Sequence, residues 1–187
     1  MRKTVIVLLA LLVLPATLWA MDINQGKIEL SGQTRFNFSK TEIETTGSPD
    51  VDETTWEFQL DGLYYLQRNL GLGVIFQYDK TETEIAGVDV DSSTFIIGPQ
   101  VTYNFPLSEK VSLFVNGAVG YATAEIDNFD ADGWAFQLGG GLKYFLTNSA
   151  SINGSLTYQN LSLEADSGGG DIDTSGINVG VGLSIYF

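Results

Sequence analysis

The side chains of this chain that could do chemistry are mostly carboxylates. The 187 residues include 23 acidic and nine basic residues, no histidine and no cysteine, and the formal net charge is −14. Nucleophilic catalysis by a hydroxyl needs an adjacent base, most often histidine, and thiol catalysis needs cysteine. Nothing in the spacing of the acidic residues places two of them in a sheltered pocket. We therefore expect a protein that is not an enzyme and that has no cofactor.

Most of the acidic residues fall in polar, turn-rich stretches. Seventeen of the 23 lie in four of them, at 42–53, 80–92, 124–133 and 164–174. One interpretation is a solvated surface whose charges repel one another. The other is divalent cation binding, because carboxylate oxygens are ligands that Ca²⁺ and Mg²⁺ prefer. The excess of acidic charge argues against nucleic acid as a partner.

One of these stretches resembles the start of a calcium-binding loop. The sequence 128–133 reads NFDADG, which has the acidic spacing and the glycine of an EF-hand. The twelfth position is Gly139, where an EF-hand needs a bidentate glutamate, and a strand pattern follows instead of a helix. We reject an EF-hand. The metal candidates that remain, for diffuse binding only, are Asp127, Asp130 and Asp132.

Segments with a period of two must position the remaining charged residues. The final segment, Ser175–Phe187, alternates an apolar row that ends at Phe187 with a row of small and polar residues. Such alternation is typical of a strand with one apolar and one polar face. It recurs at 27–41, 55–66, 70–79, 94–105, 111–123, 134–145 and 151–163. In the seventh segment the phase slips after Asn160, which predicts a bulge there or the end of the membrane zone.

Eight such segments predict a membrane barrel. Each has at least the ~9–11 residues that a tilted strand needs to cross a bilayer. Short connections at 67–69, 106–110 and 147–149 alternate with the four long acidic stretches. Bacterial barrels place short turns in the periplasm and long loops outside. We predict an all-β fold, an eight-stranded antiparallel up-and-down transmembrane β-barrel with both termini in the periplasm.

The positions of the aromatic residues support lipid outside the barrel. On the apolar rows, one set of aromatics adjoins the long stretches and a second adjoins the short turns or the carboxy terminus. The first comprises Phe38, Trp56, Tyr78, Phe95, Tyr121, Trp134 and Tyr158, and the second Tyr64, Tyr103, Phe105, Tyr144 and Phe187. Two aromatic girdles around an aliphatic band are typical of membrane barrels. The alternative, a soluble barrel such as a lipocalin with its apolar row inside, gives no reason for this segregation.

The first twenty residues predict a secretory signal peptide. Arg2 and Lys3 precede an apolar run at 4–14, and Leu18-Trp-Ala20 offers a cleavage site. The run is too short to cross a bilayer as a helix. We divide the chain into a cleaved signal peptide at 1–20 and one barrel domain at 21–187. Without Arg2 and Lys3 the mature chain carries seven basic and 23 acidic residues, a net charge of −16.

The polar rows predict the contents of the lumen, which side chains nearly fill in an eight-stranded barrel. Bulky residues near the short turns predict an apolar plug, for which we choose Tyr65, Phe114, Phe145 and Tyr186. Small and polar residues toward the long stretches predict a wetter upper half. Arg35 is expected opposite Glu57 or Gln59, as a structural ion pair or as a gating element. Lys143 is expected to reach Asp61 or Glu29.

These features together resemble the small eight-stranded outer-membrane β-barrels of the opacity-protein/OmpX type and the transmembrane domain of OmpA. The resemblance is carried by the amino-terminal segment, the eight alternating segments and the ending Val181-Gly-Leu-Ser-Ile-Tyr-Phe187. It covers essentially all of 27–187. It implies an integral protein of the outer membrane of a Gram-negative-type bacterium, with long loops extracellular. It also implies that Phe187 belongs to the signal that outer-membrane assembly machinery reads.

The resemblance leaves function open between two classes. The first is a non-enzymatic structural or surface-interaction protein with acidic extracellular loops and a mostly closed lumen. The alternative is a narrow, porin-like conduit for small solutes. Expected partners are outer-membrane lipid, lipopolysaccharide and the assembly machinery, and we expect a monomer.

Overall fold

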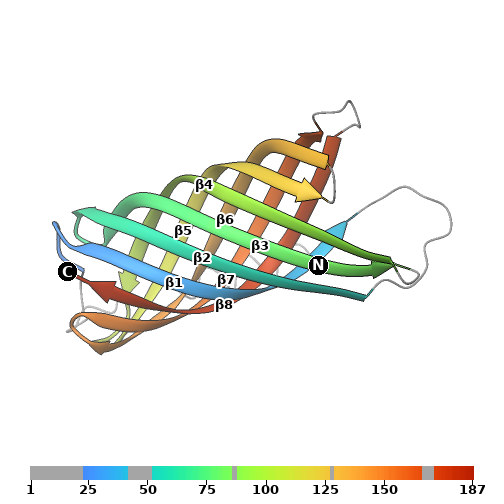
Figure 1. Cartoon of the computed structure of the whole chain (residues 1–187). Helices are drawn as coiled ribbons and strands as arrows, with labels where there is room; N and C mark the ends of the chain where they lie inside the picture. Colours follow the sequence, from blue (N-terminus) through green and yellow to red (C-terminus); the bar gives the residue numbers. More distant parts are fainter. Residues whose placement is uncertain (1–22, 42–51, 86–87, 127–128, 166–170) are drawn as a thin grey trace, which may run out of the picture.

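Eight antiparallel strands form one closed barrel (Figure 1). The computed structural model describes residues 23–41, 52–85, 88–126, 129–165 and 171–187. The strands are β1 (Ile28–Thr41), β2 (Asp52–Gln67), β3 (Leu70–Ile85), β4 (Val88–Pro106), β5 (Val111–Ile126), β6 (Phe129–Thr147), β7 (Ala150–Ala165) and β8 (Asp171–Tyr186). Each pairs with its neighbours in sequence, and β8 pairs with β1. The predicted fold class is confirmed. In the described residues no helix is long and apolar enough to cross a membrane.

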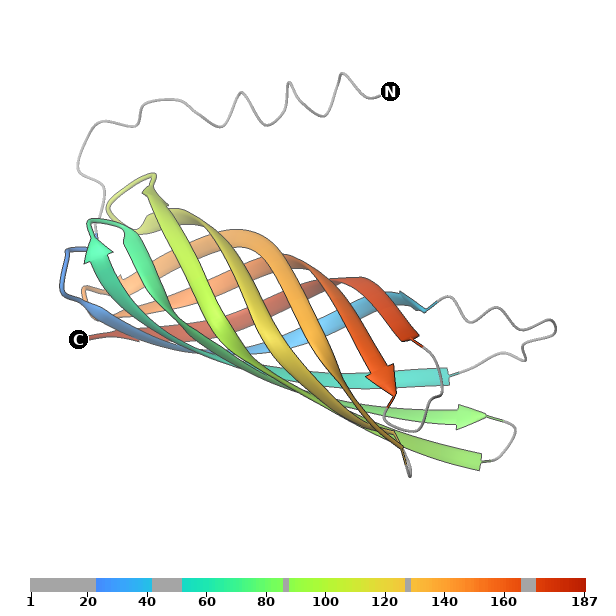
Figure 2. The same cartoon turned by 90° about the horizontal axis from the view of Figure 1, so that it is seen from above.

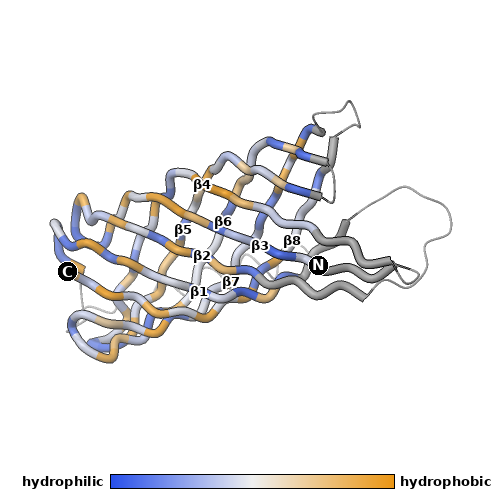
Figure 3. Tube along the Cα trace, in the orientation of Figure 1, coloured by the Kyte–Doolittle hydropathy of each residue, from blue (hydrophilic) through white to orange (hydrophobic). Residues whose placement is uncertain are grey.

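The alternation of side chains determines which face of the barrel is apolar. Along each strand, hydrophobic and hydrophilic positions alternate (Figure 3), because successive side chains of a strand point to opposite faces. The apolar row lies outside, where large side chains such as Leu138, Leu183 and Val181 remain about 60% exposed. A soluble protein rarely exposes so extensive an apolar surface. The apolar row therefore faces lipid, and the lipocalin alternative is wrong.

At one end of the barrel, exposed tyrosine and tryptophan side chains lie further out along β3 and β6 than exposed phenylalanine side chains. Tyr78, Tyr121 and Trp134 are exposed on the outer wall, and Phe76 and Phe136 lie two residues deeper on their strands. Tyrosine and tryptophan carry a polar group and suit the membrane interface, whereas phenylalanine suits the hydrocarbon. At the other end the exposed aromatics are Tyr64, Tyr103, Phe105, Tyr144 and Phe187. The side chains of Phe38 and Trp56 lie outside the described ones.

The strands extend further than the apolar pattern indicates. Stretches 80–92 and 124–133 were expected to be loops, but β3 continues to Ile85 and β4 begins at Val88. In the same way β5 continues to Ile126 and β6 begins at Phe129. The apolar row ends where the membrane ends, but the backbone ladder continues through residues with polar side chains. These hairpins project beyond the barrel wall (Figure 2).

Of the two explanations offered for the phase slip after Asn160, a bulge or the end of the membrane zone, the bulge is absent. The register between β7 and its neighbours is continuous from Ser151 to Glu164 on both sides. Leu161 and Leu163 simply belong to the inward row, so the apparent slip marks apolar residues that face the lumen. The register shifts occur instead at the two tight turns, between Tyr65 and Gln67 and between Phe145 and Thr147.

The first and last strands close the barrel at the short-turn end. The backbone amide of Phe187 donates to the carbonyl of Ile28 over 2.9 Å, and the amide of Ile28 donates back over 3.2 Å. β1 pairs with β8 up to Thr41 but with β2 only as far as Arg35 opposite Glu57. Beyond that pair the described parts of β1 and β2 diverge (Figure 2).

Candidate functional site: the polar lumen

An apolar cluster lies inside the barrel at the short-turn end. Leu63, Tyr65, Phe145 and Tyr186 are at most 4% exposed and pack together with Ile23. The rings of Phe145 and Tyr186 lie 5.6 Å apart. Three of the four predicted plug residues therefore belong to this cluster. The fourth, Phe114, is buried outside it.

Ile23 joins this cluster from the segment that precedes β1. Its amide donates to Oδ1 of Asn69 over 2.9 Å, and its carbonyl accepts from the amide of Asn69 over 2.9 Å. Asn69 adopts φ 65° in the tight turn between β2 and β3, which asparagine tolerates better than most residues. Gly26, with φ 86°, donates to the carbonyl of Tyr65 over 2.9 Å. These bonds fix residues 23–26 across the short-turn end of the barrel.

Above the cluster, Glu29 is the centre of a buried ionic network. Nζ of Lys143 lies 2.7 Å from both carboxylate oxygens of Glu29, and neither side chain is more than 3% exposed. The hydroxyl of Ser184 donates to Oε1 of Glu29 over 2.7 Å. The hydroxyl of Tyr65 donates to Oε2 of Glu29 over 2.5 Å. Nζ of Lys143 also lies 5.3 Å from the centre of the Phe114 ring. Of the two predicted partners, Lys143 reaches Glu29.

Asp61 is buried in a shell of neutral donors. Its Oδ2 accepts from Ser31 over 2.9 Å and from Gln33 over 3.2 Å. Its Oδ1 accepts from Gln59 over 2.6 Å and from Gln100 over 3.0 Å. Four hydrogen bonds satisfy a carboxylate, so dipoles offset the cost of burying this charge. The two carboxylate networks lie in the middle of the lumen, and a cavity of about 20 Å³ lies beside Glu29, Asp61 and Lys143.

Carboxamides cross the lumen above Asp61. Oε1 of Gln159 accepts from Gln77 over 3.1 Å, from Asn178 over 3.1 Å and from Gln137 over 3.3 Å. Gln137 also donates to Oε1 of Gln77. Four strands, β3, β6, β7 and β8, contribute to this cluster, so it connects opposite walls of the barrel.

The structure brings Arg35 and Glu57 together. Nη1 of Arg35 donates to Oε1 of Glu57 over 2.7 Å, and the two side chains are at most 1% exposed. Nε of Arg35 and Oε2 of Glu57 have no hydrogen-bond partner among the described residues. The pair lies where β1 and β2 diverge. The geometry suits a structural ion pair that matches charge inside a narrow lumen.

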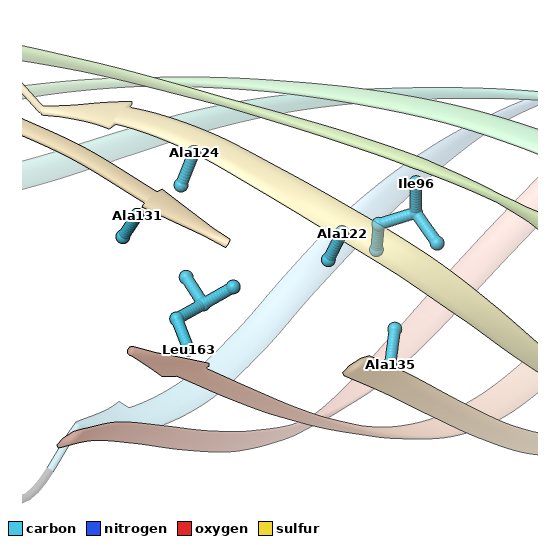
Figure 4. Packing of buried hydrophobic residues seen from close by; sticks show 6 residues of the cluster. All are labelled: Ile96, Ala122, Ala124, Ala131, Ala135 and Leu163. Carbon is cyan, nitrogen blue, oxygen red and sulfur yellow. The ribbon is translucent and has the colours of Figure 1, made fainter. Parts of the chain in front are cut away.

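A second apolar cluster fills the inner wall toward the long-loop end. Ile96, Ala122, Ala124, Ala131, Ala135 and Leu163 are at most 5% exposed, and Leu161 packs against them (Figure 4). The prediction of a wetter upper half is therefore wrong for the wall formed by β4 to β7. The small alanines were interpreted as space for water, but leucine and isoleucine side chains occupy that space.

The metal candidates do not form a site in the described residues. Asp130 and Asp132 lie on β6 and project from the outer face, and Asp132 accepts from the hydroxyl of Tyr121 over 2.7 Å. Asp127 lies outside the described residues. Among the residues that the structure describes, no group of three or more acidic residues could hold a metal ion. The stretch was expected to be a loop, and its strand conformation separates the carboxylates.

Sequence reasoning missed the contacts that cross the lumen. Alternation alone places Gln100, Gln159 and Asn104 inside, because they share the inward row with residues that were identified. It does not predict which of them meet, since their partners lie on strands that are not neighbours. Ile23 precedes the first alternating segment, and no pattern in the sequence predicts that it packs in the apolar cluster at the short-turn end.

Three solved structures are similar to the chain in fold. Neisserial surface protein A is 12% identical, with 87% of this chain and 100% of that chain covered and a TM-score of 0.66. OprG from Pseudomonas aeruginosa is 12% identical, with 88% and 97% covered and a TM-score of 0.59. Ail of Yersinia pestis, in complex with the heparin analogue sucrose octasulfate, is 16% identical, with 87% and 99% covered and a TM-score of 0.57. At these identities the likeness concerns the fold alone.

A family model identifies the chain. No curated protein matches it in sequence. The model described as "Outer membrane protein beta-barrel domain" matches residues 6–184, which include nearly all of the barrel. The closed antiparallel barrel and its apolar outer wall agree with that match. The chain therefore belongs to the outer membrane protein β-barrel domain family and is an integral protein of the Gram-negative outer membrane.

Proposed function

We propose that the chain is a non-enzymatic structural or surface-interaction protein with a closed lumen. The observation that carries the proposal is the packing of the lumen, with apolar clusters toward both ends. A cavity between them, beside Glu29 and Asp61, measures only about 20 Å³ and has room for a single water molecule. The buried carboxylates of Glu29 and Asp61 are held by several hydrogen bonds each, which suits a structural role better than proton transfer.

The alternative, a narrow conduit for small solutes, is favoured by the polar middle of the lumen. Besides Arg35 Nε and Glu57 Oε2, buried oxygens of Gln59 and Gln137 have no hydrogen-bond partner among the described residues. Such atoms would bind water if the lumen widened. The apolar clusters oppose permeation, because a hydrated solute would lose its hydrogen bonds on crossing them.

Solute uptake distinguishes the two functions. Liposomes that contain the purified barrel are expected to swell in an iso-osmotic solution of a small sugar no faster than empty liposomes. A general porin in the same liposomes provides the positive control. Swelling that accelerates with the amount of barrel would favour the conduit.

We propose that the tight turns and both ends of the described chain lie in the periplasm and that the long hairpins face outward. The tight turns and the end of β8 share one end of the barrel (Figure 1). Family barrels commonly have short periplasmic turns and long extracellular connections. Seventeen of the 23 acidic residues would then lie at the extracellular end.

The acidic end limits the partners that we propose. Ail was solved with a heparin analogue, but like charges would repel such a polyanion from this chain. We propose contacts with outer-membrane lipid and, through diffuse divalent cations, with lipopolysaccharide. The barrel closes on itself, which leaves few unpaired edges, and this supports a monomer.

We also propose that Phe187 is read by the assembly machinery. Its side chain is 64% exposed at the rim of the barrel. Phe187→Asp is expected to lower the amount of assembled barrel in outer membranes several-fold while the refolded protein loses only about 1 kcal/mol or less, because acidic residues cost little near the interface. Heat-modifiable gel mobility measures the assembled amount in membranes, and the same assay on refolded protein equilibrated in urea measures the change in the free energy of unfolding. The control is Phe105→Asp, in the same girdle. Normal assembly of Phe187→Asp would contradict the proposed role.

A further inference from the structure

A groove on the outer wall follows the seam between β1 and β8. It has a volume of about 590 Å³ and is open to the outside, and its walls include Leu30, Leu60, Leu183 and Phe58. Ser31 and Gln33, whose side chains belong to the inward row, also line it. From outside they are reachable only through their backbone. The floor of the groove is therefore the bare backbone of β1.

Position 32, on the floor of the groove, is glycine. On the outer row of β1, Gly32 lies between Leu30 and Thr34, and its cross-strand partners are Leu60 and Leu183. These four larger side chains surround a position that has none. The missing side chain deepens the groove at this point and leaves the backbone of β1 uncovered.

Packing within the barrel does not require this glycine. A Cβ at position 32 would lie 3.5 Å from Cδ2 of Leu60, an ordinary contact. At Gly182, by contrast, a Cβ would lie 2.4 Å from the carbonyl oxygen of Gly32. Glycine inside a strand weakens it and often marks the close approach of a ligand. Gly32 fits that second role.

The depth of the groove indicates its occupant. Leu183, level with Gly32, lies four residues from Phe187 in the girdle at the rim. Four residues of a tilted strand rise roughly 10 Å, which is within the ~15 Å of one leaflet. Under the orientation proposed above, that leaflet is the periplasmic one, which contains phospholipid. Leucine, valine, isoleucine and phenylalanine line most of the outer row there.

We propose that this groove is a binding site for one acyl chain of a periplasmic-leaflet phospholipid. The acyl chain lies along β1 against the backbone at Gly32, between the side chains of Leu60 and Leu183. This binding is distinct from general lipid contact, because it depends on the space above a single residue. Neither a lipid headgroup nor a second protein is required.

Native mass spectrometry of the barrel, purified with phosphatidylethanolamine and phosphatidylglycerol, tests the proposal. The wild-type barrel is expected to retain one phospholipid. Gly32→Leu places a side chain in the groove and is expected to lower the retained fraction of phospholipid about tenfold. The new side chain displaces methylene groups of the acyl chain from their apolar contacts. The control is Gly117→Leu, an outward glycine of β5 whose added Cβ meets only the carbonyl of Gln137 at 3.8 Å. It is expected to retain lipid as the wild type does.

Heat-modifiable gel mobility establishes that each variant is folded, so that loss of lipid is read only from folded barrels. Equal retention by Gly32→Leu and wild type would overturn the proposal, as would a wild-type barrel that retains none. A wild-type dimer that Gly32→Leu converts to a monomer would overturn it by identifying a second copy as the occupant. Retention of lipopolysaccharide in place of phospholipid would contradict the proposed orientation as well. These outcomes concern the outer wall and do not depend on whether the lumen is closed. Failure of the proposed closed-lumen function would therefore leave them unchanged.

Discussion

Lys143→Met is expected to lower the free energy of unfolding by about 3–5 kcal/mol, because removing one partner of a buried ion pair leaves the other charge uncompensated. Nζ of Lys143 lies 2.7 Å from both oxygens of Glu29, and neither side chain is more than 3% exposed. The hydroxyls of Ser184 and Tyr65 would be the donors left to that carboxylate. Urea unfolding of the barrel in detergent micelles measures the change.

A double variant separates the cost of the unpaired charge from the cost of lost packing. Glu29→Gln combined with Lys143→Met is expected to lose less than Lys143→Met alone, since replacing both charges is often close to neutral. The control is Lys110→Met, whose side chain is exposed in a tight turn and which should change stability by less than about 0.5 kcal/mol. A loss below about 1 kcal/mol for Lys143→Met would contradict a buried Glu29 carboxylate that depends on Lys143 for its charge balance.

Tyr65→Ala is the second change with a large expected effect. Tyr65 is fully buried in the cluster at the short-turn end and donates to Glu29 over 2.5 Å. Truncating a large buried aromatic side chain costs about 3–5 kcal/mol. Tyr65→Phe keeps the packing and is expected to lose about 1.5–3 kcal/mol, the contribution of a hydrogen bond to a charged group.

The residue before Tyr65 provides a matched control. Tyr64 is the same residue type on the same strand, but it is 48% exposed on the outer wall. Tyr64→Ala is therefore expected to cost clearly less than Tyr65→Ala in the same unfolding experiment. Equal losses for the two variants would contradict the assignment of inward and outward rows.

The period of two was sufficient to predict the barrel from the sequence. Because one face meets lipid and the other fills the lumen, a shift of one residue would move every apolar side chain to the wrong face. That constraint located the eight strands and both aromatic girdles. It also placed Arg35 opposite Glu57 or Gln59, since the two strands are neighbours joined by one connection, and the structure pairs Arg35 with Glu57.

Alternation does not predict contacts between strands that are not neighbours. Lys143 and Glu29 are 114 residues apart, and whether they meet depends on the tilt and stagger of the whole barrel. Leu161 and Leu163 suggested a bulge for another reason. In the structure they pack on the inner wall against small alanines of β6, the neighbouring strand, and of β5, and the sequence of β7 alone does not show these partners.

Hydrophobicity also does not predict where a strand ends outside the membrane. Lys80-Thr-Glu-Thr-Glu-Ile85 carries polar residues on both faces, yet its backbone pairs with β4 up to Ile85 opposite Val88. The ladder needs only backbone groups and residues that favour extended conformation, such as threonine. The acidic candidates Asp130 and Asp132 lie in such an extension, which explains why they are separated on a strand.

Electrical recording in a planar lipid bilayer tests most directly whether the lumen is closed. The wild-type barrel is expected to give no steady conductance above that of the bare bilayer. A variant that truncates both apolar clusters, with Phe145, Tyr186, Leu161 and Leu163 changed to Ala, serves as the positive control and is expected to give discrete open steps if it folds. Stable open steps of similar size from the wild-type barrel would contradict a closed lumen and would favour the conduit.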